Sequence, residues 1–353
     1  MATDMGLGRQ SMASDVLHLA ADKSRRYLQD IAERRVNPSE AALAALVELS
    51  EPFPPSPSDP SEVIAKLDQI GSAATVATTG GRYFGFVNGG MVPAALAANW
   101  LAAAWNQNAA LRVMSPIAAE LEEVVLRWVC EALGLPAACA GGLVTCATIA
   151  NFTALVTARH ALLARGGWDV TADGIFGAPP IEVVVGAEVH ASILKALSLA
   201  GFGRKRVTVV EADSQGRMRV NKLPRLSERT IVCIQAGNVN TGAFDPAGEI
   251  CKAAKEQGAW VHVDGAFGLW ARISRKYEHL TQGFEQADSW ATDAQSGPML
   301  ATTAAWRSSE MALRCVLRWE LVRPISNQVR DVSQCITSRK RRGARAGWNC
   351  GRR

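Results

Sequence analysis

The 353-residue chain lacks several features that would assign it to a membrane, a secretory route or a metalloprotein class. No apolar run approaches the roughly 18–20 residues that a membrane-spanning helix needs. The N-terminus is polar and shows no secretory signal. The eight cysteines are scattered, mostly inside apolar segments, and do not have the spacing of a metal site. We therefore expect a cytoplasmic protein with reduced core thiols, no membrane contact and no metal.

Acidic residues are scarce at one end of the chain. Residues 295–353 contain 11 Arg and one Lys against two Glu and one Asp, which is a net charge of +9. The whole chain carries +5, so residues 1–294 carry −4. A basic tail is typical of proteins that bind nucleic acid or another anionic surface. This tail has neither a helical period nor interleaved aromatic residues, which disfavours a nucleic-acid partner.

The hydrophobic pattern divides the chain into a helical N-terminal segment, 1–80, a large domain, 81–294, and a tail, 295–353, without a clear helix or strand period. Helical periodicity with proline or glycine at the ends predicts these helices: up to residue 30, 38–49, 63–74, 91–105, 116–133, 151–165, 191–200 and 246–257. Short apolar runs predict these strands: 143–146, 182–187, 206–211, 230–235 and 259–264. Strands that are apolar on both faces and alternate with helices indicate an α/β fold with a mainly parallel sheet.

Four of these strands end in small or polar residues that suit a ligand site, since ligands gather at the carboxyl ends of strands in open α/β sheets. Thr148 lies at a helix N-terminus that can bind phosphate, although most such turns are only helix caps. Asn238 and Thr241 lie in a glycine-bracketed loop. His190 ends a strand, where a histidine is more often structural than catalytic. Asp264 leaves an apolar strand, and a buried carboxylate needs a partner, for which a protonated pyridine nitrogen would serve.

Six segments carry a family resemblance, in this order: RYFGFVNGG, TCATIANFTAL, AEVHASILKAL, GNVNTGAFDP, WVHVDGAFGLW and ADSWATDA. From about residue 83 to residue 294 the chain resembles the pyridoxal-phosphate-dependent decarboxylases of the group that includes aromatic-amino-acid, glutamate and histidine decarboxylases. The resemblance implies a fold-type-I large domain, pyridoxal 5′-phosphate as cofactor, decarboxylation of an L-amino acid and a homodimer. In such enzymes the cofactor disperses the negative charge that decarboxylation leaves on carbon.

The resemblance also implies roles for individual residues. His190 would stack on the cofactor ring and serve in proton transfer. Asp264 would pair with the pyridine nitrogen, and Ala266 would pack beneath the ring. Ala147 and Thr148 would hold the phosphate. We expect His190, Asp264 and Thr148 to converge around one cleft.

Further contacts follow from the same resemblance. Asn238 and Thr241 would also contact the cofactor, and Tyr83 and Phe84 would contact the substrate. Cys146 stands beside the phosphate, at a position where the family usually has glycine.

One residue that the family needs is missing. The resting cofactor is bound covalently to a lysine in a His-Lys-Trp sequence, directly after a turn like 292–294. Here Gln-Ser-Gly follows at 295–297. The codons CAC AAG TGG become CAA AGT GG when one C is lost, which reads Gln-Ser-Gly, and the same shifted frame permits family-like sequence over more than 50 residues. We therefore interpret residues 295–353 as out-of-frame translation that should not pack as native structure, and the chain as truncated, without the small C-terminal domain and inactive.

Two other functions stay open at this point. The chain could be another fold-type-I enzyme, an aminotransferase or a desulfurase, although NVNTGAFDP and RYFGFVNGG favour the decarboxylase. It could also be a non-enzymatic protein that binds nucleic acid through the Arg-rich tail. The sequence does not determine which amino acid is the substrate, and it leaves the dimeric state of the truncated chain open.

Overall fold

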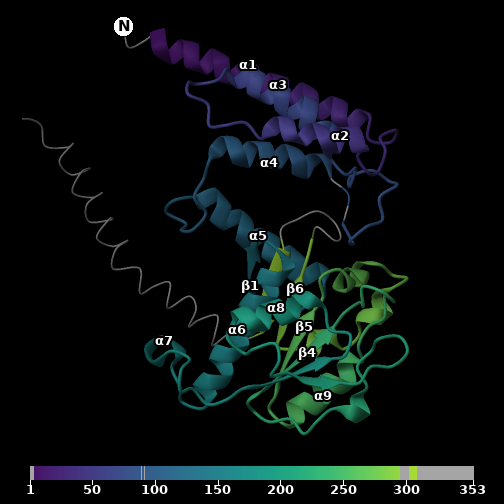
Figure 1. Ribbon diagram of the computed structural model, residues 1–353. Coiled ribbons are helices and arrows are strands. Elements are labelled where there is room, and N and C mark those ends of the chain that lie inside the picture. The colour runs from purple at the N-terminus through teal and green to yellow at the C-terminus, as the bar shows by residue number, and fades with distance from the viewer. Residues whose placement is uncertain (1–3, 89, 91, 295–301, 308–353) are drawn as a thin grey trace, which may run out of the picture.

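The computed structural model describes residues 4–88, 90, 92–294 and 302–307 (Figure 1). Within these residues the strands form one sheet in the order β1-β7-β6-β5-β4-β2-β3. The strands are β1 Cys139–Val144, β2 Glu182–Gly186, β3 Thr208–Val210, β4 Thr230–Gln235, β5 Trp260–Asp264, β6 Ser289–Thr292 and β7 Thr302–Arg307. Strands β2 to β6 pair in parallel, whereas β7 is antiparallel to both of its neighbours, β1 and β6. The predicted α/β fold with a mainly parallel sheet is confirmed.

Each predicted helix is present, and the short helix α7 is an addition. The helices are α1 Asp4–Gln29, α2 Glu40–Ala45, α3 Pro60–Gly71, α4 Pro93–Trp105, α5 Pro116–Ala132, α6 Ala147–Arg165, α7 Val170–Asp173, α8 Ala191–Leu199 and α9 Ala247–Glu256. Helices α3, α4 and α5 each begin at a proline, because an N–H in the first turn would have no helical partner. Figure 1 shows α1 to α4 as a layer apart from the sheet, with α5 leading back to it. None of the described helices combines the length and hydrophobicity needed to cross a bilayer.

Helices cover both faces of the sheet, and alternate side chains of each strand point to opposite faces. Val183 and Val185 of β2 pack with α6 and α8 in one apolar cluster. Val184 belongs to the cluster on the other face, together with Ile250 of α9 and Val129 of α5. Because both faces are covered, the central strands are apolar at almost every position, which produced the continuous apolar runs in the sequence.

The predicted strand boundaries hold best in the middle of the sheet. Strands β2, β4 and β5 lie within one residue of their predicted ends, and β3 is shorter than predicted. The prediction of a strand over 143–146 is wrong at its end, since β1 stops at Val144. Cys146 is already the N-cap of α6, so Thr145 and Cys146 form the turn into that helix.

Two strands correct the sequence prediction. The sequence did not predict β6, whose Ser289 and Thr292 look polar but are buried because their hydroxyl groups form internal hydrogen bonds. The prediction that residues 295–353 do not pack as native structure is wrong for residues 302–307. They form β7 between β1 and β6, where the facing backbone N–H and C=O groups need partners whatever the side-chain pattern. The other tail residues, with the prediction that they do not pack, lie outside the described residues.

Candidate active site

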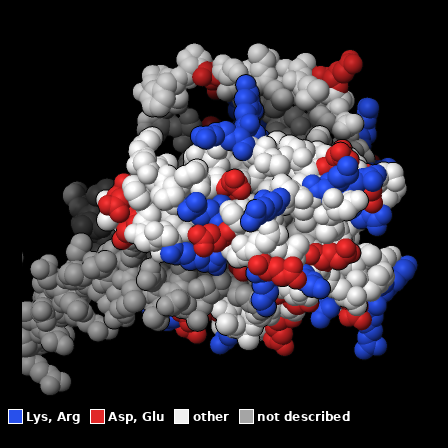
Figure 2. Space-filling view, turned by 90° about the horizontal axis from the view of Figure 1, so that it is seen from below, with Lys and Arg blue, Asp and Glu red and all other residues white. Residues whose placement is uncertain are grey.

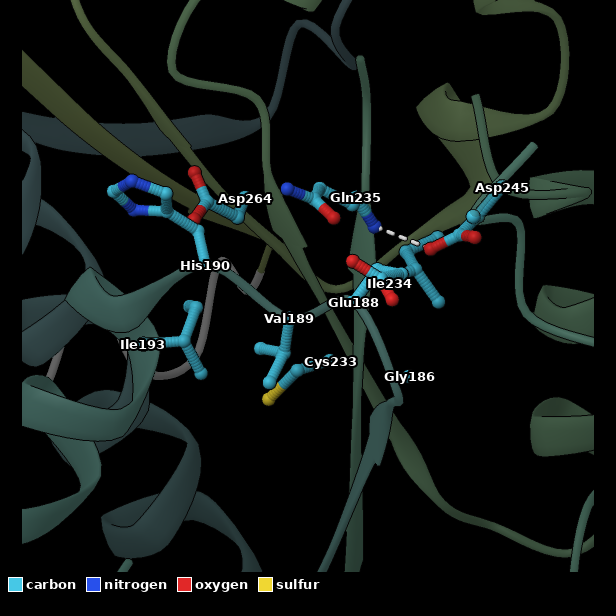
Figure 3. A pocket seen from close by; sticks show the side chains of 11 residues that line it. Gly186, Glu188, Val189, His190, Ile193, Cys233, Ile234, Gln235, Asp245 and Asp264 are labelled. Atoms are coloured by element: carbon cyan, nitrogen blue, oxygen red, sulfur yellow. Dashed lines mark hydrogen bonds between the residues drawn. The ribbon is translucent and has the colours of Figure 1, made fainter. Parts of the chain in front are cut away.

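A pocket opens at the carboxyl edge of the sheet, beyond the ends of β2, β4 and β5 (Figure 3). Parallel strands end at the same edge, so Gly186, Gln235 and Asp264 come together there. His190 and Ile193 line the pocket from the start of α8. Its empty volume is about 300 Å³, part of which is open to solvent. This edge is the place where α/β proteins of this type bind ligands.

Asp264 is a buried carboxyl group at the end of β5, with 5% of its surface exposed. Its Oδ2 accepts a hydrogen bond from the Ser192 hydroxyl at 3.3 Å, and its Oδ1 accepts one from the Ala266 N–H at 3.3 Å. Among the described residues no Lys or Arg forms an ion pair with it. Burial raises the pKa of Asp264, and the nearby His190 opposes that rise. A carboxylate has about four acceptor positions, so a further donor from the pocket can bind here.

His190 is the N-cap residue of α8 and lies next to Asp264 in the pocket (Figure 3). Its Nδ1 accepts a hydrogen bond from the Ser192 N–H at 3.3 Å and lies 2.9 Å from the Ser192 hydroxyl oxygen. Since that hydroxyl also contacts Asp264, one serine links the two predicted residues. The structure thus brings His190 and Asp264 together on one side of the sheet edge.

The opposite wall of the pocket contains a second buried carboxyl group, Asp245. It accepts hydrogen bonds from the Met218 N–H and from the Gln235 N–H, both at 2.7 Å. Burial raises the pKa of Asp245, and these two bonds oppose the rise. Because its oxygens are already bound to backbone donors, Asp245 fixes the pocket wall rather than offering a binding group. The sequence reading did not identify it.

The predicted cofactor contacts Asn238 and Thr241 lie in the loop after β4, and neither lines the pocket. The Asn238 Oδ1 accepts hydrogen bonds from the N–H groups of Asn240, at 2.9 Å, and Thr241, at 3.2 Å. The Thr241 hydroxyl donates to the Gln215 carbonyl at 2.7 Å. In the described contacts both side chains hold the loop together.

The predicted phosphate contacts Ala147 and Thr148 form the first turn of α6. Cys146, the N-cap, makes no side-chain hydrogen bond to that turn, so its backbone N–H groups are not capped by it. Thr148 does not line the pocket, but the same helix reaches the site one turn later. There the Asn151 amide donates to the Ser192 hydroxyl at 3.4 Å. The N-terminus of α6 therefore adjoins the His190–Asp264 pair.

The predicted substrate contacts are not at the pocket. Tyr83 is half-buried and Phe84 is 91% exposed, in the loop between α3 and α4. Neither residue lines the pocket. Conversely, the structure adds Ser192, which the sequence reading missed although it follows His190 by two residues, the spacing of a helix-capping pair.

The donor set at this edge fits pyridoxal phosphate. A buried carboxylate without a described cationic partner, Asp264, suits a protonated ring nitrogen. The imidazole of His190 lies beside it, and the uncapped start of α6 suits an anionic phosphate. No lysine occurs at 295–297, where the resemblance places the covalent attachment point. Fold and site together define a fold-type-I α/β protein of the pyridoxal-phosphate class.

The comparison with known families agrees with this class. Residues 49–308 match the family described as "Pyridoxal-dependent decarboxylase conserved domain", so the chain belongs to this family. The match is wider than the resemblance over residues 83–294, since it includes α3 and also β7. The predicted family and its cofactor, pyridoxal phosphate, are confirmed.

Similar proteins include several decarboxylases. The acidic amino acid decarboxylase GADL1 of Bos taurus is 30% identical over 62% of this chain and 42% of its own length. The L-2,4-diaminobutyrate decarboxylase of Rhizobium meliloti (strain 1021) is 34% identical over 56% of this chain and 39% of its own length. The crystal structure of mouse CSAD in apo form shares the fold, with a TM-score of 0.74 at 24% identity over 86% of this chain and 65% of that one. This chain spans about two fifths of the length of these curated relatives.

Proposed function

We propose that this chain is the cofactor-binding part of a pyridoxal-phosphate-dependent decarboxylase that acts on an L-amino acid. The observation that carries the proposal is the arrangement of Asp264, Ser192 and His190 at the pocket. It offers a buried carboxylate and an imidazole to one aromatic ring. Family membership favours decarboxylation over the aminotransferase or desulfurase alternative.

Each residue of the pair has a task that its contacts support. When bound, the cofactor supplies an electron sink for the bond that breaks. Asp264 would keep the ring nitrogen protonated, because a carboxylate in a dry site favours a cation at hydrogen-bond distance. His190 would restrain the ring plane. Its Nδ1 is engaged with Ser192, so the other ring nitrogen, Nε2, is the one that can hold or deliver a proton.

We propose further that the chain binds the cofactor without a covalent bond at the family position and is inactive, because residues 295–297 are Gln-Ser-Gly. A slip of one nucleotide explains this sequence. Strand β7 is compatible with the slip. Losing one nucleotide changes the side chains after residue 294 but not the number of residues that precede β7, so the backbone can still reach its place between β1 and β6. Sequencing the encoding DNA around codon 295 in independent isolates tests the slip, and a clean open frame in all of them would refute it.

A cofactor titration tests the function directly. Added pyridoxal phosphate should bind saturably and keep the absorption of the free aldehyde. Borohydride reduction should leave no adduct in the peptide covering residues 290–300. Asp264→Ala should weaken the saturable binding, whereas Lys195→Ala, an exposed position on α8, should not. Absence of saturable binding by the intact chain would overturn the proposal.

We propose an amino acid as the substrate, without specifying its side chain. Curated relatives are named for acidic amino acids, L-2,4-diaminobutyrate and tryptophan, which differ in side-chain charge. We infer an L-amino-acid substrate for the frame-corrected enzyme. Carbon dioxide release from a panel of acidic, basic and aromatic amino acids would identify it, and release from none of them would speak against a decarboxylase.

We also infer a homodimer that uses α4. This helix is apolar and contains no buried residue, and Trp100, Leu101 and Trp105 are 45%, 53% and 50% exposed. An apolar surface of this kind is typical of an interface. Light scattering of the full chain should give twice the monomer mass, and Leu101→Glu should reduce it. A monomer at all concentrations would contradict this inference.

A nucleic-acid role finds no support in the globular body. On the face drawn in Figure 2, basic and acidic side chains are mixed over the described residues. Residues 1–294 carry a net charge of −4. We therefore propose no nucleic-acid partner. Tight, strongly salt-dependent binding of a duplex oligonucleotide would show that the tail has such a role.

A further inference from the structure

A buried chain of polar side chains lies behind the pocket. The Trp260 Nε1 donates a hydrogen bond to the Ser289 hydroxyl oxygen at 2.9 Å. That oxygen lies 3.0 Å from Nδ1 of His262, and Nε2 of His262 lies 2.9 Å from Oδ1 of Asn151. All four side chains are almost completely buried, at 2% exposure or less. Residues from β5, β6 and α6 are thus linked by hydrogen bonds.

The same chain continues to the pocket. The Asn151 amide nitrogen donates to the Ser192 hydroxyl at 3.4 Å, and that hydroxyl donates to Oδ2 of Asp264 at 3.3 Å. His190 is the other neighbour of the hydroxyl. Its Nδ1 already accepts the Ser192 N–H, so the hydroxyl hydrogen is left for the carboxylate. The chain therefore begins at an indole and ends at Asp264.

Two members set the direction of the bonds: the indole nitrogen of Trp260 can only donate, and the amide oxygen of Asn151 can only accept. An indole nitrogen can only donate, so the Ser289 oxygen accepts from Trp260 and its hydrogen is available for His262. His262 then accepts at Nδ1 and donates from Nε2 to the amide oxygen of Asn151. A neutral imidazole has one donor and one acceptor, as this sequence of bonds requires. Burial lowers the pKa of His262 to about 3, which keeps the ring neutral near pH 7.

We propose that Asn151 and His262 are positioning residues for Asp264: through Ser192 they hold a hydrogen-bond donor against its buried carboxylate and fix the carboxylate toward the pocket. The proposal rests on the proposed function only for the identity of the group that Asp264 meets in the pocket. Neither residue lines the pocket. His262 acts through Asn151, and Asn151 acts through Ser192 and through its own side-chain interaction with Asp264, which lowers the pKa of that carboxyl. A hydrogen bond to the charged form favours ionisation, which opposes the effect of burial on Asp264.

The direction of these hydrogen bonds can be measured on the unsubstituted protein, with one variant needed only to assign the signal. Nitrogen-15 NMR of the full chain, with labelled histidine, reports which ring nitrogen of His262 carries the proton. His262→Gln identifies the signal by its disappearance. The Nε2–H form is expected, and the Nδ1–H form would overturn the proposal, because Asn151 would then have to turn its amide and leave Ser192 without that donor.

Substitutions test the effect on Asp264. Asn151→Leu keeps the volume and removes the amide, so carbon-13 NMR should show Asp264 titrating at higher pH. Binding of pyridoxal phosphate should weaken by about tenfold. His262→Gln preserves a donor near Nε2 and should stay close to the parent, whereas His262→Leu should behave like Asn151→Leu. Thr157→Val is the control, since it removes another buried polar group of α6, whose hydroxyl donates to the Thr153 carbonyl among the described residues.

The outcomes separate this inference from the proposed function. If Asp264 titrates at higher pH in Asn151→Leu but neither the parent protein nor any variant binds pyridoxal phosphate, the positioning role stands and the proposed function fails. If the cofactor binds and Asp264 titrates at the same pH in Asn151→Leu as in Thr157→Val, the positioning role is refuted. If Asn151→Leu does not fold, the titration in His262→Leu compared with His262→Gln decides in the same way.

Discussion

Replacing Asp264 with asparagine should change folding stability and cofactor binding in opposite directions. Without cofactor, the carboxyl group is buried, and no described Lys or Arg forms an ion pair with it. Its folded pKa is raised by burial, so the folded chain binds the proton more tightly than the unfolded chain. The free energy of unfolding therefore falls as the pH rises above about 4 toward the folded pKa, by about 1.4 kcal/mol for each unit of the shift.

Asp264→Asn removes this loss, because an amide does not ionise. Its oxygen can accept the Ala266 N–H, and its nitrogen can donate to the Ser192 oxygen, so no buried group is left without a partner. We expect the variant to be at least as stable as the parent above the folded pKa of Asp264. With cofactor, the variant lacks a charged acceptor for the ring nitrogen. That hydrogen bond is worth about 1.5–3 kcal/mol, which corresponds to roughly 10–150-fold weaker binding.

Urea unfolding at pH 5 and pH 8 without cofactor, followed by a titration with pyridoxal phosphate, measures both effects. Asp245→Asn is the matched control at the same pocket. Both oxygens of Asp245 accept backbone N–H groups at 2.7 Å, so an amide nitrogen would face a donor and cost about 1–3 kcal/mol. The reasoning is refuted if Asp264→Asn is less stable than the parent at pH 8 and binds the cofactor equally well.

Three further predictions concern the buried His262 and the packing around the site. Below pH 6.5 the buried His262, with its pKa lowered to about 3, contributes a loss of stability that approaches about 1.4 kcal/mol per pH unit, while Asp264 contributes in the opposite direction. Urea unfolding between pH 4 and 7 should show that the unfolding free energy of His262→Gln lacks this contribution to the pH dependence. The same pH dependence in the parent and in His262→Gln would contradict the neutral state of buried His262. Gly268→Ala should cost at least about 2 kcal/mol, because a Cβ there would meet the Ala236 carbonyl, whereas Gly81→Ala meets nothing. Trp290→Ala should cost about 3–5 kcal/mol in thermal unfolding, and a change below 1 kcal/mol would show that the site repacks.

The central strands could be predicted because their environment leaves a strong pattern. Strand β4, for example, has all but its last residue buried and is apolar from Ile231 to Ile234. Strand β6 left no such pattern, since Ser289 and Thr292 are buried through hydrogen bonds that only the folded chain reveals. Strand β7 is placed by backbone pairing with β1 and β6, which no side-chain period records.

The site could be predicted in part. Asp264 ends β5 as predicted, whereas His190, predicted to end a strand, is the N-cap of α8 four residues after β2, and the structure places the two together. Their supporting residues could not be found in this way. Asn151 lies 111 residues before His262, and nothing in the local sequence of either predicts the contact between them. Asn238 was predicted as a cofactor contact, but its bonds within a loop depend on the turn geometry.

The most direct test of the account compares this chain with the protein made from a gene in which one nucleotide is restored at codon 295. Both are incubated with pyridoxal phosphate, reduced with borohydride and mapped by peptide mass. The account predicts a reduced adduct on the lysine that replaces Ser296 in the restored protein, and none in residues 290–300 of this chain. An adduct in that region of this chain, or none in a folded restored protein, would contradict it.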